Sequence, residues 1–357
     1  MRVGIVGYGN LGKACEKIGY ARKDMDIVGV FTRRDPSGLK SPYYTPFYAQ
    51  SDVFDFHKDI DVLALCTGSA QDLTGLALEV AKVFNTVDTF DNHSKMKEYI
   101  FNLDKVAKDH GTLSIVGAGW DPGVLSLVRC YVEGVTGLKS HTFWGKGVSQ
   151  GHSEAIRKIK GVKRAVQYTL PKDSAIDKVK CGQSDLSVYD KHKRECYVVV
   201  DDGADEIEIE RQIKEMPSYF RGYETDVHFI NEIDFDKNHR SLYHNGQILC
   251  YGNLLGVDNM RYDKNITSSN KSTDKTEKIE VLDCENVIED DEEKGVGIEF
   301  SLTIPSNPEF TATILMAYVG CAYRLYQSGV RGAKTVLDLP VSALFDCNRL
   351  DTIAKYL

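Results

Sequence analysis

Three glycines near the amino terminus have the spacing of a turn that binds dinucleotides. A short apolar run over residues 3–6 leads into them, and a helical pattern over residues 11–21 follows. In a G-x-G-x-x-G turn of this kind the glycines let the backbone approach a pyrophosphate, whose negative charge faces the amino end of the helix. We predict a dinucleotide site formed by Gly7, Tyr8, Gly9, Asn10, Leu11 and Gly12.

The residues that choose between cofactors follow about 20 positions later, at the end of a second expected strand. An enzyme that uses NAD usually has an acid there, whereas this chain has Thr32, Arg33 and Arg34. Two guanidinium groups suit the 2′-phosphate of NADP, because each offers a planar fork to phosphate oxygens. Asp35 would hold the ribose instead if the strand ended later. The pair of arginines favours NADP.

Small residues follow the next expected strand, over residues 61–66. Because such residues at the carboxyl end of a parallel strand can line the cofactor crevice, we assign Cys66, Thr67, Gly68, Ser69 and Ala70 to the cofactor site. The alternative is a helix cap at Ser69, and both interpretations stay open.

Two aspartates follow two further expected strands. Asp91 lies in DTFDNH, at the end of the strand segment 85–90, and Asp121 lies in GWDPG, after the segment 112–116. Ligands bind at the carboxyl ends of parallel strands in this fold, and two carboxylates near a nicotinamide could hold an ammonium group and help to remove its proton. Loop aspartates also serve as caps and turn residues, which is the alternative for each.

The order of the expected elements places these residues along one sheet. Short apolar strands alternate with helical patterns, which is typical of an α/β fold with a Rossmann-type doubly wound parallel sheet. After about residue 122 the pattern changes to an α+β region. The strands expected first cover 3–6, 26–31, 61–66, 85–90 and 112–116, and those expected later cover 141–144, 165–170, 195–200 and 225–230.

The domain limits follow from this change of pattern. We expect a dinucleotide-binding domain formed by residues 1–121 together with about 310–357, because a late helical stretch should return to the first sheet. Residues 122–309 would form a substrate-binding and dimerisation domain. Within it, residues 258–294 carry 12 acidic and 6 basic residues, a composition that cannot bury enough apolar surface to order itself. We interpret them as a charged surface insertion.

Composition narrows the class of protein. The 357 residues are 42% hydrophobic and 27% charged, as is usual for a soluble globular protein. A net charge of −8 gives no general attraction to nucleic acid or to an anionic membrane. No apolar run approaches the roughly 20 residues that span a bilayer. The nine cysteines form no C-x-x-C pair, which argues against zinc, and without a signal peptide they favour the reducing cytoplasm.

Eight short segments, taken in order, resemble one enzyme family. As a set they are similar to meso-diaminopimelate dehydrogenase over nearly the whole chain, apart from the insertion and the extreme carboxyl end. The resemblance implies an NADP-dependent homodimer in bacterial lysine and cell-wall precursor synthesis. The implied reaction oxidises the D-configured centre of meso-2,6-diaminopimelate to L-2-amino-6-oxopimelate, ammonia and NADPH. The segments are GYGNLG, DTFDNH, GWDPG, HTFWGKGVSQGHS, AVQYTLP, HKREC, MPSYFRGYE and NPEFTA.

The resemblance also implies roles for single residues. Asp91 and Asp121 would meet the reacting amino centre, and Trp120 would border it. Arg194 would pair with the distal carboxylate, to which Arg can offer two parallel hydrogen bonds; the alternative is a surface charge before a strand. The family also presents an asparagine to the distal centre, for which we name Asn259, although Asn253 lies near. The remaining implied residues are Trp144, Ser149, Gln150 and Gly151 along the pocket, with Thr169 and His244 at the distal centre.

Two questions have more than one answer at this point. The general base is Asp91 or Asp121, with His93, His152 and His244 as further candidates. For the whole chain, the alternatives are another NAD(P)-dependent oxidoreductase of amino-acid metabolism and a non-catalytic NADP-sensing protein. A sensor would keep the glycines and arginines but would not need two aspartates and a distal arginine together, so we favour catalysis.

Overall fold

The computed structural model describes residues 1–357 except 69–71, 184, 218, 242, 254–294 and 347–348. The described chain forms two compact units, Met1–Val128 with Ser306–Leu357, and Arg129–Pro305. The first boundary falls inside the continuous helix α4 (Val124–Thr136). The sequence placed this boundary after residue 121, because only the turn before the helix is visible as a pattern.

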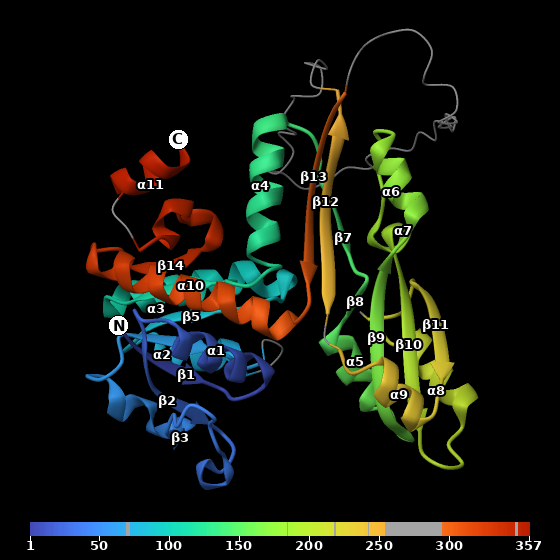
Figure 1. Ribbon diagram of the computed structural model, residues 1–357, viewed down its shortest axis with the longest axis horizontal. Coiled ribbons are helices and arrows are strands. Elements are labelled where there is room, and N and C mark those ends of the chain that lie inside the picture. Colours follow the sequence, from blue (N-terminus) through green and yellow to red (C-terminus); the bar gives the residue numbers. More distant parts are fainter. Residues whose placement is uncertain (69–71, 184, 218, 242, 254–294, 347–348) are drawn as a thin grey trace, which may run out of the picture. The chain divides into compact units, whose positions relative to one another are not determined.

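The first unit is built on a seven-stranded sheet in which every neighbouring pair of strands is parallel (Figure 1). Its order is β14-β6-β5-β4-β1-β2-β3. The direction of winding reverses between β1 and β4, and in open α/β sheets a crevice for ligands opens at such a point. The strands are β1 (Arg2–Val6), β2 (Asp26–Thr32), β3 (Phe47–Ala49), β4 (Val62–Leu65), β5 (Asn85–Asp88), β6 (Leu113–Val116) and β14 (Gly332–Thr335).

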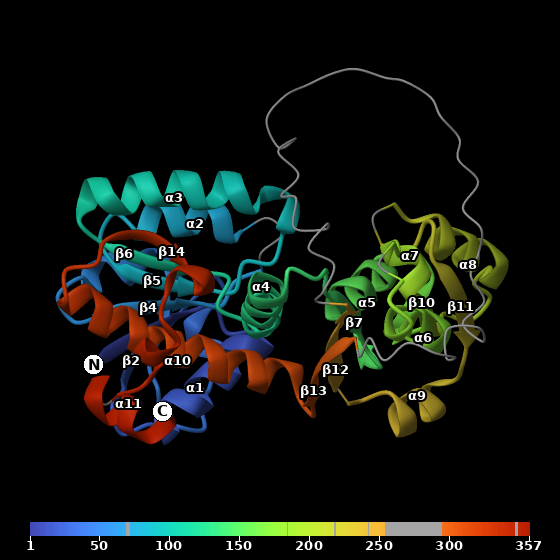
Figure 2. The ribbon, with the colours of Figure 1, turned by 90° about the horizontal axis from the view of Figure 1, so that it is seen from above.

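Helices cover both faces of this sheet (Figure 2). The four residues of β4 are all buried, and they alternate between two apolar layers. Val62 and Ala64 pack in the layer that contains residues of α1 and α10, whereas Leu63 and Leu65 pack in the layer of α2 and α3. The helices are α1 (Asn10–Ala21), α2 (Leu73–Val80), α3 (Met96–His110), α10 (Asn307–Gln327) and α11 (Arg349–Tyr356).

The carboxyl-terminal segment completes the first sheet. After α10 the chain forms β14, which pairs with β6 at the sheet edge. The backbone N–H of Ala333 donates to Asp104 on α3 at 2.9 Å, which fixes this edge strand to a helix. Neither β14 nor β3 was predicted from the sequence, because strands of four and three residues are too short to show a periodic pattern.

The second unit contains two sheets. In the sheet of order β11-β10-β9-β8, β10 is parallel to β11 and antiparallel to β9. The sheet of order β13-β12-β7 is antiparallel, and residues 253–295 connect β12 to β13. The strands are β7 (His141–Trp144), β8 (Gly147–Val148), β9 (Val162–Pro171), β10 (His192–Val200), β11 (Glu224–Phe229), β12 (His244–Gly252) and β13 (Val296–Ile304).

Separate apolar clusters hold the helices of this unit on its sheets. Ile156 of α5 and Ile209 of α8 pack with Cys196 of β10. Val179 of α6 packs with Leu249 of β12. Each sheet therefore has a helix-covered face. The helices are α5 (Gln150–Arg157), α6 (Asp173–Lys180), α7 (Val188–Lys191), α8 (Glu206–Glu215) and α9 (Glu232–Asn238).

The fold class expected from the sequence is confirmed: a doubly wound parallel sheet occurs with an α+β unit of mixed and antiparallel strands. The insertion predicted over 258–294 lies outside the described residues. Within the described part of the chain, no helix combines the length and the apolar character that crossing a bilayer requires.

Candidate active site

The glycine turn joins β1 to α1, and its glycines serve different purposes. A Cβ atom at position 12 would lie 2.0 Å from the carbonyl oxygen of Gly7, so α1 can approach the strand end only if Gly12 has no side chain. A Cβ atom at position 9 would meet no described atom within 4 Å. Gly9 therefore leaves open the surface in front of α1, where a pyrophosphate would approach the backbone and the helix amino end.

A buried carboxylate anchors this turn. Glu16 on α1 accepts hydrogen bonds from the hydroxyl groups of Tyr8 at 2.6 Å and Ser41 at 2.5 Å. Burial and the neighbouring carboxylate raise the pKa of the Tyr8 hydroxyl, so it remains a donor. Asn10 and Leu11 form the start of α1, and Leu11 packs against the core. The sequence analysis missed Glu16, because a glutamate in a helical pattern gives no sign of its burial.

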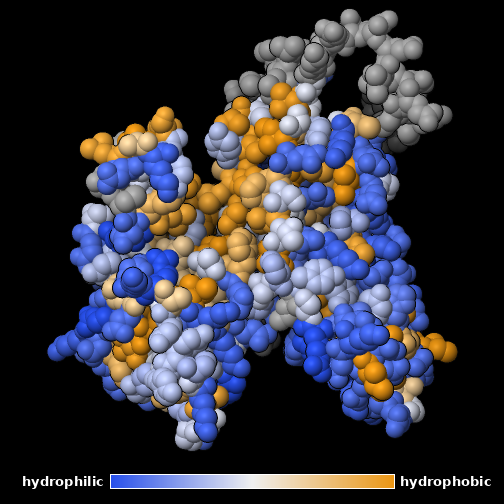
Figure 3. Space-filling view, in the orientation of Figure 1, coloured by the Kyte–Doolittle hydropathy of each residue, from blue (hydrophilic) through white to orange (hydrophobic). Residues whose placement is uncertain are grey.

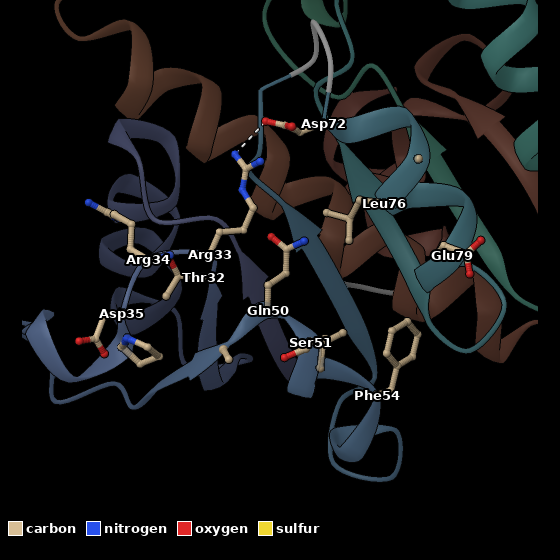
Figure 4. A pocket seen from close by; sticks show the side chains of 14 residues that line it. Thr32, Arg33, Arg34, Asp35, Gln50, Ser51, Phe54, Asp72, Leu76 and Glu79 are labelled. Carbon is tan, nitrogen blue, oxygen red and sulfur yellow. Dashed lines mark hydrogen bonds and ion pairs between the residues drawn. The ribbon is translucent and has the colours of Figure 1, made fainter.

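A cavity of about 690 Å³ opens beside the end of β2 (Figure 4). Its lining includes the predicted residues Thr32, Arg33 and Arg34. The cavity also contains side chains from the 3-10 helix η2 (Gln50–Phe56) and from α2 with its preceding turn, which the sequence analysis did not identify. Both arginines line this cavity, and guanidinium groups suit a phosphate. The labelled residues beyond β2 and its following turn are Gln50, Ser51, Phe54, Asp72, Leu76 and Glu79.

The two arginines are positioned by different contacts. Arg33 donates to Asp72 Oδ2 at 2.8 Å, and its side chain remains 61% exposed (Figure 4). Arg34 donates through its guanidinium to the backbone carbonyl of Tyr8 and through its backbone N–H to the Thr32 hydroxyl at 3.2 Å. Arg34 thereby connects the cavity to the glycine turn.

Asp35, the alternative ribose-binding acid, makes hydrogen bonds within the turn that follows it. Its carboxylate accepts from the backbone N–H of Ser37 at 3.0 Å and from the Ser37 hydroxyl at 2.8 Å, which caps the 3-10 helix η1 (Pro36–Gly38). These hydrogen bonds keep the pKa of Asp35 below its ordinary value. Because β2 ends at Thr32, the strand stops short of Asp35, and the geometry favours the arginines for the ribose end of the cofactor.

The end of β4 meets the glycine turn from the other side. Cys66 donates from its backbone N–H to the last residue of β1 at 2.7 Å. The hydroxyl oxygen of Thr67 is buried and has no hydrogen-bond partner among the described residues, which suits a polar group of a ligand in the crevice. Gly68 is exposed beside it. Ser69, with its alternative role as a helix cap, and Ala70 lie outside the described residues.

The loops that carry Asp91 and Asp121 leave the same edge of the sheet, because they follow the neighbouring parallel strands β5 and β6. Asp88 joins them: its Oδ1 accepts from the backbone N–H of Phe90 at 2.9 Å and of Gly117 at 3.2 Å. Asp91 is exposed and Asp121 is half-buried. The two candidate catalytic loops are therefore tied to one buried carboxylate.

Asp88 itself is fully buried, and the sequence analysis did not identify it. The hydroxyl of Tyr99 donates to its Oδ2 at 2.6 Å. Burial raises the pKa of Asp88 to about 6, although its hydrogen bonds act in the opposite direction. An aspartate at the end of a short strand has the same pattern as any turn residue, so the sequence contained no signal for this role.

The start of α10 orients Trp120. The indole Nε1 of Trp120 donates to Asn307 Oδ1 at 3.2 Å, and the Thr311 hydroxyl donates to the same oxygen at 3.1 Å. Asn307 is the first residue of the NPEFTA segment. This contact gives that segment a structural role, because it brings the start of α10 to the loop after β6.

In the second unit, Thr169 pairs with both Arg194 and Gly147, and His244 lies against Gly147. Thr169 and Arg194 lie opposite each other on β9 and β10, and Arg194 Nη1 donates to Thr169 Oγ1 at 2.5 Å. Gly147 pairs with Thr169, and a Cβ atom on Gly147 would lie 2.4 Å from the imidazole of His244. The missing side chain of Gly147 thus leaves room for His244 beside the paired strands that carry Thr169 and Arg194.

The guanidinium of Arg194 is buried and only partly satisfied. Arg194 is 8% exposed, and its guanidinium carbon lies 4.1 Å from the centre of the Tyr223 ring. The Nε atom of Arg194 has no hydrogen-bond partner among the described residues. Burial lowers the pKa of Arg194, yet a guanidinium stays charged at neutral pH. A buried cation with an unsatisfied N–H indicates a site that takes an anion such as a carboxylate.

Two neutral acceptors lie near this cation. Burial, with the charge of Arg194 as a second cause, lowers the pKa of His152 to about 4, so its imidazole is neutral. Nδ1 of His152 and Oε1 of Gln167 are buried without a hydrogen-bond partner among the described residues. Gln167 also donates to Thr169 at 3.4 Å. A cation beside neutral acceptors suits a zwitterion, which has both a carboxylate and an ammonium group.

His192 fixes the position of Trp144. The backbone N–H of Trp144 donates to His192 Nε2 at 2.8 Å, and the two rings stack with centroids 5.2 Å apart. Burial lowers the pKa of His192 to about 4, which keeps this nitrogen an acceptor. Ser149 caps α5 and accepts a hydrogen bond from the backbone of this helix, and Gln150 and Gly151 form its first turn.

The predicted residues thus fall into two sets. The cofactor residues, Asp91, Trp120 and Asp121 lie at the carboxyl edge of the parallel sheet, and the others lie on β7, β9, β10, α5 and β12 of the second unit. Asn259 and the side chain of His93 lie outside the described residues. Within the described chain, no group of three or more His, Cys, Asp or Glu side chains has an arrangement that could hold a metal ion.

Comparison with known proteins identifies relatives along the whole chain. Residues 119–268 match the model of the diaminopimelic acid dehydrogenase C-terminal domain. The chain is 42% identical over 346 residues to the meso-diaminopimelate D-dehydrogenase of Ureibacillus thermosphaericus, which covers 96% of this chain and 95% of that relative.

Two solved structures are similar over the full length. The diaminopimelate dehydrogenase of C. glutamicum in complex with diaminopimelate is 38% identical, with a TM-score of 0.84 over 100% of this chain and 99% of that one. An engineered D-amino acid dehydrogenase bound to NADP+ is 37% identical, with a TM-score of 0.81 and the same coverage.

Replacement of either cavity arginine should weaken NADP more than NAD. Arg33→Ala or Arg34→Ala removes a charge-assisted contact to the 2′-phosphate, so we expect the KM for NADP to rise about tenfold or more while the KM for NAD changes little. Arg22→Ala is the control, because Arg22 pairs with Asp24 at the far end of α1. Steady-state rates with both cofactors measure the effect. An equal loss with NAD and NADP would contradict the assignment.

Proposed function

Since the chain belongs to the meso-diaminopimelate D-dehydrogenase family, we propose that it catalyses the NADP-dependent oxidative deamination of the D-configured centre of meso-2,6-diaminopimelate. The reversible reaction yields L-2-amino-6-oxopimelate, ammonia and NADPH, and it serves lysine biosynthesis. The observation that carries the substrate assignment is the buried guanidinium of Arg194, whose unsatisfied Nε requires an anion. The distal carboxylate of the substrate supplies that anion.

The first unit fits NADP at three places. The open surface at Gly9 suits the pyrophosphate, Arg33 and Arg34 suit the 2′-phosphate, and the buried Thr67 hydroxyl suits a further polar group of the cofactor. The cofactor, when bound, supplies the acceptor for the hydride. The chain's own residues must therefore bind the substrate, orient its amino group and move protons.

Asp91 and Asp121 act at the D-centre. Their carboxylates accept hydrogen bonds from the substrate ammonium, and one of them takes the proton that must leave before the carbon can lose its hydrogen with two electrons. The resulting substrate imine adds water and releases ammonia to give the ketone. Trp120, oriented by Asn307, borders this centre. The contacts of Asp88 with both loops support this assignment, because they place two carboxylate-bearing loops beside each other.

A different set of residues is assigned to the distal L-centre. Arg194 pairs with the carboxylate. Thr169, which accepts a hydrogen bond from Arg194, and His244, which lies against Gly147, supply further polar contacts. Trp144, with Ser149, Gln150 and Gly151, lines the pocket. Asn259 remains a predicted contact for the same centre.

The chemistry of the histidines favours an aspartate as the base. His152 has a pKa of about 4 and lies near the charge of Arg194, so it is a weak proton acceptor at neutral pH. Nδ1 of His244 lies 2.7 Å from the carbonyl oxygen of Asn245, which indicates that this nitrogen carries a proton and that only Nε2 could accept one. The alternatives for the whole chain, another NAD(P)-dependent oxidoreductase or a non-catalytic sensor of NADP, leave the combination of Asp91, Asp121 and a buried Arg194 without a purpose.

The enzyme is further proposed to be a homodimer in the cytoplasm. On α4, Tyr131 and Val135 lie one turn apart and are 71% and 60% exposed, and hydrophobic side chains gather over this helix (Figure 3). Apolar side chains on a helix surface suit burial against a second copy of the chain. The seven cysteines reported for the described residues are free thiols, as is usual in a reducing compartment.

The purified protein should reduce NADP with meso-diaminopimelate but not with the L,L-isomer, because only the meso compound has a D-centre. NADPH absorbance and ammonia release measure the reaction, and the two products should appear in equal amounts. Comparable rates with the L,L-isomer would place the chemistry at an L-centre. Binding of NADP without turnover of either isomer would support the sensor.

Asp121→Asn should lower the turnover number by about 10²–10⁴-fold, because it removes a group that orients the amine and exchanges its proton. Asp91→Asn should have the same direction of effect. Asp109→Asn, an exposed change on α3, is the control and should leave the rate unchanged. NADPH titration should show the same affinity in all variants. Nearly normal turnover in Asp121→Asn would remove Asp121 from the mechanism.

Arg194→Ala should raise the KM for meso-diaminopimelate by roughly 30-fold or more, because it leaves the distal carboxylate without its buried partner. The affinity for NADP should not change. Arg194→Lys should fall in between, since it keeps the charge but loses the planar fork. A D-amino acid that lacks a distal carboxylate serves as an internal control and should react no worse with the variant. Equal losses with both substrates would assign Arg194 a structural role only.

A further inference from the structure

We propose that Asp88 is a positioning residue that keeps the Asp91 and Asp121 loops in a fixed relation to each other. The inference rests on the proposed function, because it concerns the loops that carry the two proposed catalytic carboxylates. Asp88 is 0% exposed, so it acts through the loop backbones and not by contact with a substrate.

Four hydrogen bonds define this role. Oδ1 of Asp88 accepts from the backbone N–H of Phe90 at 2.9 Å and of Gly117 at 3.2 Å, and Oδ2 accepts from Tyr99 at 2.6 Å. The backbone carbonyl of Asp88 accepts from Ala118 at 2.8 Å. Phe90 immediately precedes the first catalytic aspartate, and Gly117 opens the segment that contains the second. One residue therefore contacts both loops near their origins.

The hydrogen bonds of Asp88 lie just beyond the last paired residues of β5 and β6. The parallel pairing of β5 with β6 includes Val87 and Ile115 and continues no further. Beyond that pair, Asp88 and Val116 each pair only with the neighbouring strand on the other side, and the loops that follow share no regular ladder with each other. The Asp88 carboxylate replaces the ladder with charge-assisted hydrogen bonds to both segments, and such bonds are about twice as strong as neutral ones.

The cost of this carboxylate supports a purpose beyond packing. Burial raises the pKa of Asp88 to about 6, which shows that the charged form is disfavoured at this position. Tyr99, whose hydroxyl donates a hydrogen bond to the Asp88 carboxylate, comes from α3 on one face of the sheet. A buried charge is tolerated when its hydrogen bonds are made, and here the donors come from both loops and from a helix.

The same strand offers a matched control at its other end. Oδ1 of Asn85 accepts from the backbone N–H of Leu113 at 3.0 Å, and its Nδ2 donates to the carbonyl oxygen of Asp61 at 3.0 Å. Asn85 thus ties β5 to the start of β6 with a buried side chain, as Asp88 does beyond the end of that strand. It lies at the amino edge of the sheet, away from the site. Loss of Asn85 should lower stability without altering the catalytic loops.

The test compares four variants at a temperature at which thermal unfolding shows that all are folded. Asp88→Ala should lower kcat by roughly 100-fold, the scale of a small misplacement of catalytic groups, while the Kd for NADPH stays within about twofold. Asn85→Ala should keep kcat within about twofold although it also loses buried hydrogen bonds. Asp88→Asn should recover most of kcat, because Oδ1 can still accept from both loops while Nδ2 donates to Tyr99. Tyr99→Phe should lie between Asp88→Asn and Asp88→Ala.

Equal kcat values for Asp88→Ala and Asn85→Ala would overturn the positioning role, as would loss of NADPH binding in folded Asp88→Ala. Comparison with Asp121→Asn separates this inference from the proposed function. A slow Asp121→Asn enzyme with a normal Asp88→Ala enzyme overturns the positioning role alone. Normal turnover in both Asp91→Asn and Asp121→Asn overturns the proposed catalytic roles, whatever Asp88→Ala does.

Discussion

The parallel alignment of β1, β4, β5 and β6 is the constraint on which the rest of the site depends. Because these strands run in one direction, their carboxyl ends lie at one edge of the sheet. The glycine turn, Thr67, Asp91 and Asp121 are all carried by the segments that follow these ends. An antiparallel neighbour would begin where the others end, and its following loop would leave from the opposite edge. The same order also places the reversal of winding between β1 and β4, next to the glycine turn.

Three supporting side chains hold the loops at this edge of the sheet in place. Glu16 anchors Tyr8 of the glycine turn, Asp88 anchors the two aspartate loops, and Asn307 anchors Trp120. Two of them are buried carboxylates, which are costly unless their hydrogen bonds are made. Hydrogen bonds to such groups give the loops directional contacts that apolar packing does not provide.

In the second unit, the buried charged group is the cation of Arg194. Arg194 is buried against Tyr223, with one N–H bonded to Thr169 and Nε without a partner among the described residues. A cation in such a place is stabilised by an anion with matching geometry, so the arrangement selects a carboxylate. A ligand without a carboxylate would leave the guanidinium unsatisfied. In the proposed function, substrate choice and the cost of burying Arg194 therefore have the same physical origin.

The sequence by itself determined the fold class and the family, and it predicted the glycine turn, the arginine pair and the two aspartates as site residues. Each of these depends on residues close together in the chain, or on the order of short segments, and local order is what a sequence records. Only the tertiary structure decided which side chains support them. Trp120 and Asn307 are 187 positions apart, and Arg194 meets Thr169 because two antiparallel strands pair in one register. Such contacts are set by the packing of whole elements, so a buried Glu16 or Asp88 shows no local pattern that distinguishes it from an exposed acid.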